Sequence, residues 1–341
     1  MKKQPAKADI IAVANAARVS PATVSRAFNH PEMVKAPTRK RIEKAVEKLG
    51  YIRNRAAQMI HGRRSATVGL IVPTMNNAIF SEVTQAFSDA ADDAGFTILM
   101  ATHGYDLQRE VSVLRKFLEH RVDGVALIGL DHLDAIHTLI NQQAIPTVAI
   151  WNHDPASDIS CVGVDNSEAG YAAARHLIEL GHRDIGLAFP PTDDNERARG
   201  RLAGVMRAMN EGGLSVSDTW RTQAIYNVSV AKQAILTLLE GTAPPTALIC
   251  GNDIIAQGAL FAAQRLGVRV PEHLSIMGIG DFAGSADLEP GLTTVRLPAW
   301  EIGQEAGRYL CSKIVGEEEP GVYRARFEVA LIARGTTGRA V

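Results

Sequence analysis

The chain has 341 residues, with 36 Lys and Arg against 37 Asp and Glu, and a formal net charge of −1. Its length predicts two or three domains, and no apolar run approaches the ~20 residues that a membrane-spanning helix needs. The N-terminus is basic but no apolar signal core follows it, so we expect a cytoplasmic protein without membrane contacts. The three cysteines are scattered in apolar surroundings, which argues against disulfides and against a metal site.

Charge is divided unevenly along the chain. Residues 1–64 contain 15 Lys and Arg against 4 Asp and Glu, a net charge of +11, which leaves −12 for the remainder. A small basic head on a large acidic body is typical of a polyanion-binding module joined to a second domain. An ordinary solvated charged surface is the alternative explanation.

The head begins with two short helical patterns joined by a tight turn. Asp9 can cap a first helix that ends near Ala17, and Ser20 can cap a second helix with Pro21 at its first position. Only two residues lie between them, so the stretch predicts a helix-turn-helix whose second helix enters the major groove of DNA. A simple helical hairpin is the alternative.

The second helix has an apolar stripe and an opposite face that suits DNA. Val24, Ala27 and Phe28 recur at helical spacing and form the stripe. The opposite face carries small, hydrogen-bonding or cationic side chains, namely Ala22, Thr23, Ser25, Arg26 and Asn29. A third helix over about residues 38–49, ended by a glycine, completes a minimal core.

The segment between head and body predicts a conditional helix. Asn54 can cap about two turns that end at Gly62, and isolated helices of this length are not stable in water. The segment should therefore fold only against DNA or a partner copy, with Met59 and Ile60 available as apolar wedges for the minor groove. A disordered linker is the alternative from spacing alone.

From Thr67 onward, strand-like apolar runs alternate with amphipathic helical segments, which predicts parallel sheets wrapped by helices. The predicted strands are Thr67–Val72, Phe96–Ala101, Val122–Ile128, Thr147–Trp151, Cys161–Val164, Asp184–Phe189, Ala247–Cys250 and Leu274–Ile279. The remaining ~275 residues exceed one small sheet, so we expect two α/β subdomains with a ligand site where their strand ends face each other.

No constellation in the body indicates catalysis. The sequence has no nucleophile elbow, no Walker-type phosphate loop and no strong metal-ligand spacing, and Gly278-Ile279-Gly280 lacks the rest of a dinucleotide fingerprint. The histidines His103, His132, His137 and His153 lie in loops or on helix faces without paired cysteines or carboxylate spacing, so we expect surface or hydrogen-bonded histidines rather than metal ligands. We therefore expect no enzyme activity, no cofactor and no metal.

A series of short motifs then follows in order along nearly the whole chain. The head contains Val19-Ser20-x-x-Thr23-Val24-Ser25-Arg26, Thr38-Arg39 and Leu49-Gly50-Tyr51-Ile52-x-Asn54. The body contains Val122-Asp123-Gly124, Leu180-Gly181-His182-Arg183, Arg201-Leu202-Ala203-Gly204, Asn252-Asp253 and Leu292-Thr293-Thr294-Val295. In this order they resemble the lactose/galactose repressor (LacI/GalR) family of transcriptional regulators.

The resemblance implies a fold, a set of partners and domain boundaries. We expect an all-α helix-turn-helix head, an α/β periplasmic-binding-protein-like core of two parallel-sheet subdomains, and a homodimer on a pseudo-palindromic operator in double-stranded DNA. Residues 1–53 would form the DNA-binding domain, 54–65 the hinge helix and linker, and 66–341 the effector-binding and dimerisation core. The N-subdomain is expected at about 66–163 and 295–324, and the C-subdomain at about 164–294 and 325–341.

The resemblance also assigns DNA contacts. Pro21, Ala22 and Arg26 fall where the family reads operator bases, and Arg26 is the strongest reader because its guanidinium forks onto guanine. Thr23, Ser25 and Asn29 are expected on phosphates, and the expected DNA-binding set is completed by Ser20, Asn54, Ala57 and Ile60. Ile60 matches the family's hinge leucine. Arg18 replaces a common turn glycine, which costs about 1 kcal/mol if its φ is positive.

An effector pocket follows from the same resemblance. The expected effector-binding residues are Thr74, Asn76, Phe80, Trp151, Asp165, Arg201, Tyr226, Asn252 and Asp281. Arg201 matches the arginine that often binds ligand hydroxyls or a carboxylate, and its planar fork suits either group. Asn252 and Asp165 have a simpler alternative role as helix caps.

Two departures from the family pattern bear on the effector. Gly280 replaces an Asp that commonly grips sugar hydroxyls, and Trp151 stands where another acidic group often lies. The loss of two carboxylates makes the pocket less hostile to an anion, while Arg201 remains as a cationic anchor. We therefore expect a sugar effector, and more specifically a sugar acid of the gluconate type.

Other functions fit parts of the sequence. An activator of the same family would carry the same motifs. A sugar-binding transport protein would need a signal peptide and would lack the basic head, and an α/β enzyme with a DNA-binding head would need a catalytic constellation. Residues alone leave open whether the effector induces or co-represses. No heptad-rich tail follows Glu328, which favours a dimer over a tetramer.

Overall fold

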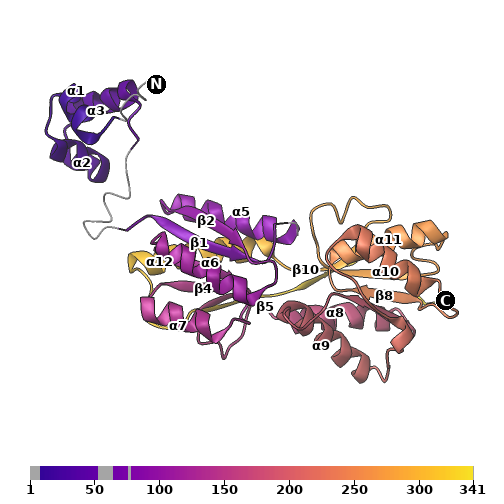
Figure 1. Cartoon of the computed structure of the whole chain (residues 1–341). Helices are drawn as coiled ribbons and strands as arrows, with labels where there is room; N and C mark the ends of the chain where they lie inside the picture. Colours follow the sequence, from indigo (N-terminus) through magenta and orange to yellow (C-terminus); the bar gives the residue numbers. More distant parts are fainter. Residues whose placement is uncertain (1–7, 53–63, 76–77, 341) are drawn as a thin grey trace, which may run out of the picture. The chain divides into compact units, whose positions relative to one another are not determined.

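The computed structural model describes residues 8–52, 64–75 and 78–340 of the chain. They fall into two compact units, Met1–Ser65 and Ala66–Val341, referred to below as unit 1 and unit 2 (Figure 1). Each unit has its own hydrophobic core.

Unit 1 is built from three helices, α1 (Ile10–Ala17), α2 (Pro21–Asn29) and α3 (Ala36–Leu49), with a short 3-10 turn η1 (Pro31–Met33) before α3. Asp9 and Ser20 cap the first two helices, accepting hydrogen bonds from the backbone N–H groups of Ala12 at 2.8 Å and Thr23 at 3.1 Å. Gly50 ends α3 in the left-handed conformation, with φ of 58°. The predicted helix-turn-helix and third helix are confirmed, although α3 begins two residues early because a proline fits its first turn.

The core of unit 1 is small and apolar. Its buried residues are Val13, Ala14, Ala17, Val24, Ile42 and Ala45. The rings of Phe28 and Tyr51 lie 6.2 Å apart at its edge. Arg18, in the turn between α1 and α2, has φ of 53°, so the strain expected at this position is present.

Unit 2 contains two six-stranded sheets. Sheet A has the strand order β11-β5-β4-β3-β1-β2 and is parallel throughout, whereas sheet B has the order β12-β10-β9-β8-β6-β7 and is parallel except for β12. Sheet A consists of β1 (Thr67–Val72), β2 (Thr97–Thr102), β3 (Gly124–Ile128), β4 (Thr147–Asn152), β5 (Cys161–Val164) and β11 (Arg324–Phe327). Sheet B consists of β6 (Ile185–Phe189), β7 (Arg221–Gln223), β8 (Ala247–Cys250), β9 (Ser275–Gly280), β10 (Thr293–Arg296) and β12 (Ala330–Ile332).

Helices cover the sheets (Figure 1). Those that follow strands of sheet A are α5 (Ala78–Asp93), α6 (Leu107–Glu119) and α7 (Asp134–Gln143), and α12 (Ala299–Val315) joins them. Those around sheet B are α8 (Asn166–Glu179), α9 (Glu196–Glu211), α10 (Val228–Leu239) and α11 (Asp253–Leu266), with the 3-10 turn η2 (Asp218–Trp220) before β7. None of the described helices is long and apolar enough to cross a membrane.

Each sheet with its helices forms one half of unit 2. The described chain crosses from one half to the other three times, after β5, after β10 and after β11. In Figure 1 the late helix α12, drawn in yellow, lies among the early violet elements. The later two passages come a few residues after the predicted positions 295 and 325. The reason is pairing: Val295 stays in register with Ile279 in sheet B, and Phe327 with Val164 in sheet A.

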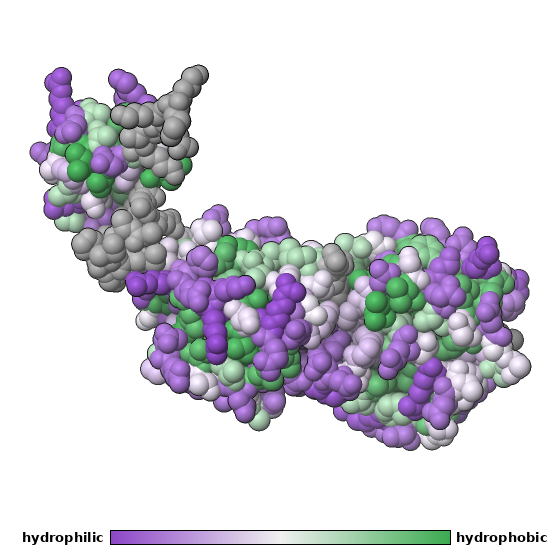
Figure 2. Space-filling view, viewed as in Figure 1, coloured by the Kyte–Doolittle hydropathy of each residue, from purple (hydrophilic) through white to green (hydrophobic). Residues whose placement is uncertain are grey.

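Hydrophilic and hydrophobic residues are interspersed over the visible face of unit 2 (Figure 2). Inside, one buried cluster extends across both sheets, from Val68 and Val162 on one side to Met277 and Val295 on the other. The two halves therefore share a continuous apolar core in this structure. The functional side chains lie where that core meets the ends of the strands.

Candidate functional site

Helix α2 of unit 1 presents its polar side to solvent. Pro21, Ala22 and Arg26 are exposed, while Val24 on the other side is fully buried in the head. Within the described part of the chain, the Arg26 guanidinium has neither a hydrogen-bonding nor an ionic partner. A free guanidinium on an exposed helix face is available for a base edge or a phosphate.

The other polar residues of α2 hold one another in place. The hydroxyls of Ser20 and Thr23 are 2.9 Å apart, and the Asn29 amide donates to the Ser25 hydroxyl at 3.2 Å. These side chains are ordered on the same helix that exposes Arg26. The hinge residues predicted to contact DNA, Asn54, Ala57 and Ile60, lie outside the described residues.

Unit 2 contains a small chamber at the ends of strands from both sheets, which we call the inner chamber. Its described lining is Phe80, Tyr105, Trp151, Arg197, Arg201, Tyr226, Asn252 and Phe282. Four of these eight residues, Tyr105, Tyr226, Asn252 and Phe282, come within three residues after a strand of sheet A or sheet B, where ligands of open parallel sheets bind. The free volume is only about 10 Å³, so the side chains nearly close it.

A second and larger space, the outer chamber, adjoins the first. It has a volume of about 470 Å³ and is lined by Thr74, Tyr105, Pro190, Pro191, Asp193, Asp194, Asn195, Ile225 and Tyr226. Tyr105 and Tyr226 line both chambers, and their rings lie 6.1 Å apart with 34° between their planes. The Asn195 amide donates to the Tyr226 hydroxyl at 3.0 Å and fixes that ring.

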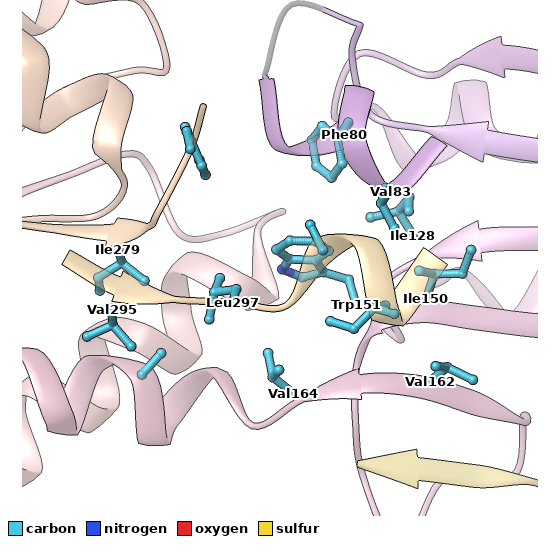
Figure 3. Packing of buried hydrophobic residues seen from close by; sticks show 14 of the residues in the cluster. Phe80, Val83, Ile128, Ile150, Trp151, Val162, Val164, Ile279, Val295 and Leu297 are labelled. Carbon is cyan, nitrogen blue, oxygen red and sulfur yellow. The ribbon is translucent and has the colours of Figure 1, made fainter. Parts of the chain in front are cut away.

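Trp151 at the end of β4 closes the inner chamber. Its side chain is 1% exposed, and its indole lies between Phe80 and Leu297 in Figure 3. Its φ of 92° is in the region that side-chain-bearing residues rarely adopt, which turns the indole away from the regular strand. Gly163 makes this possible, because a Cβ there would approach the Trp151 carbonyl carbon to 2.3 Å.

Arg201 is the most deeply placed cation of the chamber. Its Nε donates to the Asn166 amide oxygen and one terminal nitrogen donates to the Gly251 carbonyl, each at 2.9 Å. Both acceptors are neutral, and Arg201 forms no ion pair within the described residues. Burial lowers the pKa of the guanidinium because the charge is removed from water. The site therefore holds a positive charge that an anion would compensate.

Arg197, one helical turn before Arg201 on α9, is a second buried cation. Its nearest carboxylate is Glu196, at 3.7 Å. Glu196 in turn accepts hydrogen bonds from the backbone N–H groups of Leu130 at 2.5 Å and Asp131 at 3.0 Å. Burial raises the pKa of Glu196 against the opposing effect of Arg197. An ion pair between Arg199 and Asp131 joins the same two segments. This polar latch connects the start of α9 with the loop after β3.

The loop after β3 is supported from behind by a buried pair. His132 and Glu110 are almost fully buried, with 2.9 Å between the His132 Nδ1 and a Glu110 oxygen. The His132 Nε2 lies 3.0 Å from the Gly129 carbonyl. Burial opposes the charged imidazole, but the hydrogen bond and charge of Glu110 outweigh it and raise the pKa of His132. The pair thereby holds in place the loop after β3, whose backbone N–H groups donate to Glu196.

The predicted departure at Gly280 has a steric explanation. A Cβ at Gly280 would lie 2.1 Å from the Phe282 ring, and the residue has φ of 143°. The buried carboxylate of Asp253 holds this turn by accepting from the Phe282 N–H at 2.9 Å and from the hydroxyls of Ser285 at 2.8 Å and Thr294 at 2.6 Å. The Phe282 ring therefore occupies the space that a side chain at position 280 would need, and it lines the inner chamber.

The structure gathers most of the predicted effector residues but not all. Phe80, Trp151, Arg201, Tyr226 and Asn252 line the inner chamber, and Thr74 lines the outer one together with Tyr226. Asn252 also caps α11, accepting from the Ile255 N–H at 3.1 Å, so its two proposed roles coexist.

Two predicted positions lie outside both chambers, and a third is not among the described residues. Asp165 caps α8, accepting from the Ser167 N–H at 2.8 Å, and lines a separate cavity of about 570 Å³. The Asp281 carboxylate is held at 2.7 Å by each of Arg296 and Arg334 and lines neither chamber. Asn76 lies outside the described residues.

Sequence reasoning did not assign Tyr105, Arg197 or Phe282 to the pocket. For Arg197 a signal was present, because a spacing of four residues from Arg201 places both on one face of a helix. Tyr105 and Phe282 come shortly after strands β2 and β9, just as the predicted residue Asn252 comes shortly after strand β8. They point into the cleft because of the conformations of their loops, and the strand pattern in the sequence does not specify those conformations.

Comparison with known proteins gives matches in both units. Residues 10–54 match the model of bacterial regulatory proteins of the lacI family, and residues 174–337 match a periplasmic binding protein-like domain. Among curated proteins, the HTH-type transcriptional repressor PurR of Escherichia fergusonii is 32% identical over 309 residues, covering 90% of each chain.

Solved structures give the same pattern. The transcription regulator GntR from Chromobacterium violaceum is 32% identical with a TM-score of 0.75, covering 80% of this chain and 99% of that one. The lac repressor dimer bound to operator and the anti-inducer ONPF is 25% identical with a TM-score of 0.85, covering 98% of this chain and 100% of that one.

Proposed function

Because this chain belongs to the LacI family of bacterial regulatory proteins, we propose that it is a transcriptional repressor whose affinity for operator DNA is set by a small anionic effector in unit 2. The family resemblance in the head and core motifs, the helical DNA-binding head and the two-sheet core are confirmed. Relatives of this family are regulators, and the proposal assigns no catalytic step to the cleft.

For DNA recognition, the proposal rests on helix α2. Its exposed face carries Pro21, Ala22 and Arg26. The Arg26 guanidinium is available to donate two hydrogen bonds to a guanine in the major groove. A homodimer presents two such helices, so the operator is a pseudo-palindrome with one half-site for each head. The segment 54–65 is proposed as the hinge that links each head to its core.

For the effector, the observation that carries the proposal is the buried Arg201 guanidinium, which forms no direct ion pair among the described residues and is compensated only in part by the charge of Asp253. A buried guanidinium with two neutral acceptors retains N–H groups for a ligand, and a carboxylate satisfies both its charge and its fork geometry. The inner chamber has no carboxylate in its described lining that would repel such an anion. We therefore propose a sugar acid of the gluconate type rather than a neutral sugar.

The coupling between effector and DNA is a linkage between two states of the core. Effector can shift operator affinity only by as much as it binds one state better than the other. With about 10 Å³ free in the inner chamber, a ligand enters only when the two halves of unit 2 separate. The effector thereby selects among core arrangements, and the hinge passes that selection to the heads.

A ligand screen by thermal unfolding of the full-length protein tests this proposal. Aldonates such as gluconate should raise the melting temperature in a concentration-dependent way, since a ligand that binds only the folded state stabilises it by mass action. Neutral hexoses and purines should not. Stabilisation by neutral hexoses or purines and none by aldonates would remove the sugar-acid proposal, without affecting the family assignment.

A further inference from the structure

The two chambers of unit 2 carry charges of opposite sign. Arg197 and Arg201 line the inner chamber, and its described lining has no acidic residue. Asp193 and Asp194 line the outer chamber, and its described lining has no Lys or Arg. A ligand that extends through both chambers therefore meets a cationic inner end and an acidic outer end.

The two chambers adjoin at two shared tyrosines. Tyr105 and Tyr226 belong to both linings, and the hydrogen bond from Asn195 holds the Tyr226 hydroxyl at 3.0 Å. Aromatic rings and the nearby Pro190 and Pro191 offer apolar faces at the boundary. The carboxylates of the outer chamber are hydrogen-bond acceptors, which suits hydroxyl groups. This combination of apolar faces and acceptors matches the two sides of a sugar ring.

The size of the outer chamber sets the length of the ligand. Its volume of about 470 Å³ is by itself in the range of complete ligand pockets, roughly 300–1,000 Å³. When the two halves of unit 2 separate to admit a ligand, a single aldonate held at Arg201 occupies the widened inner chamber and leaves the outer chamber to solvent. A ligand with a second ring fills it.

We propose that the outer chamber is a second sugar subsite and that the effector is a glycosylated aldonate. This rests on the proposed function, in which the carboxylate lies against Arg201. The neutral glycosyl ring then occupies the outer chamber, with its hydroxyls on Asp193 and Asp194 and its apolar face on the tyrosines. A second negative group at the outer end is disfavoured because those carboxylates repel it. The site thus selects a monoacid with a neutral sugar at its far end, against dicarboxylates of similar length.

Calorimetric titration of the full-length protein with four probes tests the inference. The probes are gluconate, lactobionate (a galactosylated gluconate), lactose and the diacid form of lactobionate whose galactose C6 is oxidised to a carboxylate. Lactobionate should bind at least tenfold more tightly than gluconate, because only lactobionate occupies both chambers. Lactose, which lacks the carboxylate, should bind at least tenfold more weakly than lactobionate. The diacid, whose second carboxylate lies in the outer chamber beside Asp193 and Asp194, should also bind at least tenfold more weakly than lactobionate.

Variants of the chamber wall separate the two subsites. Ile225, half exposed on the outer wall, is replaced by a larger side chain in Ile225→Trp, which should bring the affinities for lactobionate and gluconate to within about twofold of each other. Val322→Trp places the same change on another exposed aliphatic residue that lines neither chamber, and should keep the tenfold preference.

Neutralising the two carboxylates tests the acidic end of the outer chamber. The double substitution Asp193→Asn/Asp194→Asn should raise the affinity for the diacid at least threefold. The matched control Glu272→Gln/Asp287→Asn removes two exposed charges outside both chambers and should leave the affinity for the diacid unchanged.

The outcomes distinguish the subsite from the proposed function. Equal binding of gluconate and lactobionate, unaltered by Ile225→Trp, overturns the second subsite and leaves the acid effector in place. Binding of lactose with no binding of either acid overturns the acid effector itself. Binding of the diacid as tightly as lactobionate overturns the charge selection.

Discussion

Replacing Arg201 by methionine separates effector recognition from folding. Met has a similar length and no charge, so Arg201→Met removes the cation while keeping most of the buried volume. A charge-assisted hydrogen bond contributes about 1.5–3 kcal/mol, and a bidentate contact to a carboxylate has two. We expect a loss of about 3 kcal/mol in the binding of an aldonate, which is more than 100-fold in affinity.

The effect on the unliganded protein should be small by comparison. The substitution leaves the Asn166 amide oxygen and the Gly251 carbonyl without their donors, at about 1–3 kcal/mol each. It also removes a buried charge without an ion pair, whose desolvation penalty is several kcal/mol. These terms have opposite signs, so the melting temperature of the free protein should change by only a few degrees.

Three measurements complete the test. Calorimetry gives the affinity for gluconate, thermal unfolding gives the stability, and fluorescence anisotropy gives operator affinity without effector, which should be unchanged. Arg207→Met is a matched control on the same helix, because Arg207 is exposed, lies over the Tyr171 ring at 4.3 Å and is in the described lining of neither chamber. Unchanged gluconate affinity in folded Arg201→Met protein would refute the assignment of Arg201 as the anion anchor.

Further predictions concern the head, the latch and the strained tryptophan. Arg26→Ala should reduce discrimination at one base pair of each half-site by about 1–3 kcal/mol, seen in competition with scrambled duplex; equal loss on both duplexes contradicts base reading. The raised pKa of His132 means that its pair with Glu110 is complete below about pH 6.5 and weakens as pH rises through the folded-state pKa. The stability difference between wild type and His132→Gln in chemical denaturation should therefore shrink from pH 6 to pH 9, and a constant difference argues against the charged pair. Gly163→Ala should lower stability by about 3 kcal/mol by displacing Trp151, and should weaken effector binding; a melting temperature within a degree of wild type contradicts the close contact.

Long, regular elements were predictable from the sequence for physical reasons. Asp9, Ser20 and Gly50 mark helix ends because their side chains, or the lack of one, satisfy the backbone at those points. Thr67–Val72 and Cys161–Val164 were bounded correctly because a strand buried on both faces is apolar at nearly every residue.

The short edge strands were not predicted from the residue pattern. β7, β11 and β12 have three or four residues each and are partly exposed, so their composition does not differ from that of loops. Pairing with a neighbouring strand, which is a long-range property, defines them. The predicted passages near 295 and 325 were early for this reason.

The candidate site was predictable where the residue type determines the role, as for Arg201. It was not predictable where backbone geometry decides. Asp281 has a positive φ, and its carboxylate forms ion pairs with Arg296 and Arg334. The sequence of the loop alone does not indicate this backbone conformation or these partners. The assignment of the whole set to an effector remains a prediction.

The near closure of the inner chamber also has a consequence for timing. A space of about 10 Å³ is too small for a metabolite, so we expect the two halves of unit 2 to separate before an effector enters or leaves. That separation would break the contacts of Glu196 and Arg199 with the loop after β3. Motions of this kind fall on the microsecond-to-second scale, so effector exchange would be slower than diffusion into an open pocket.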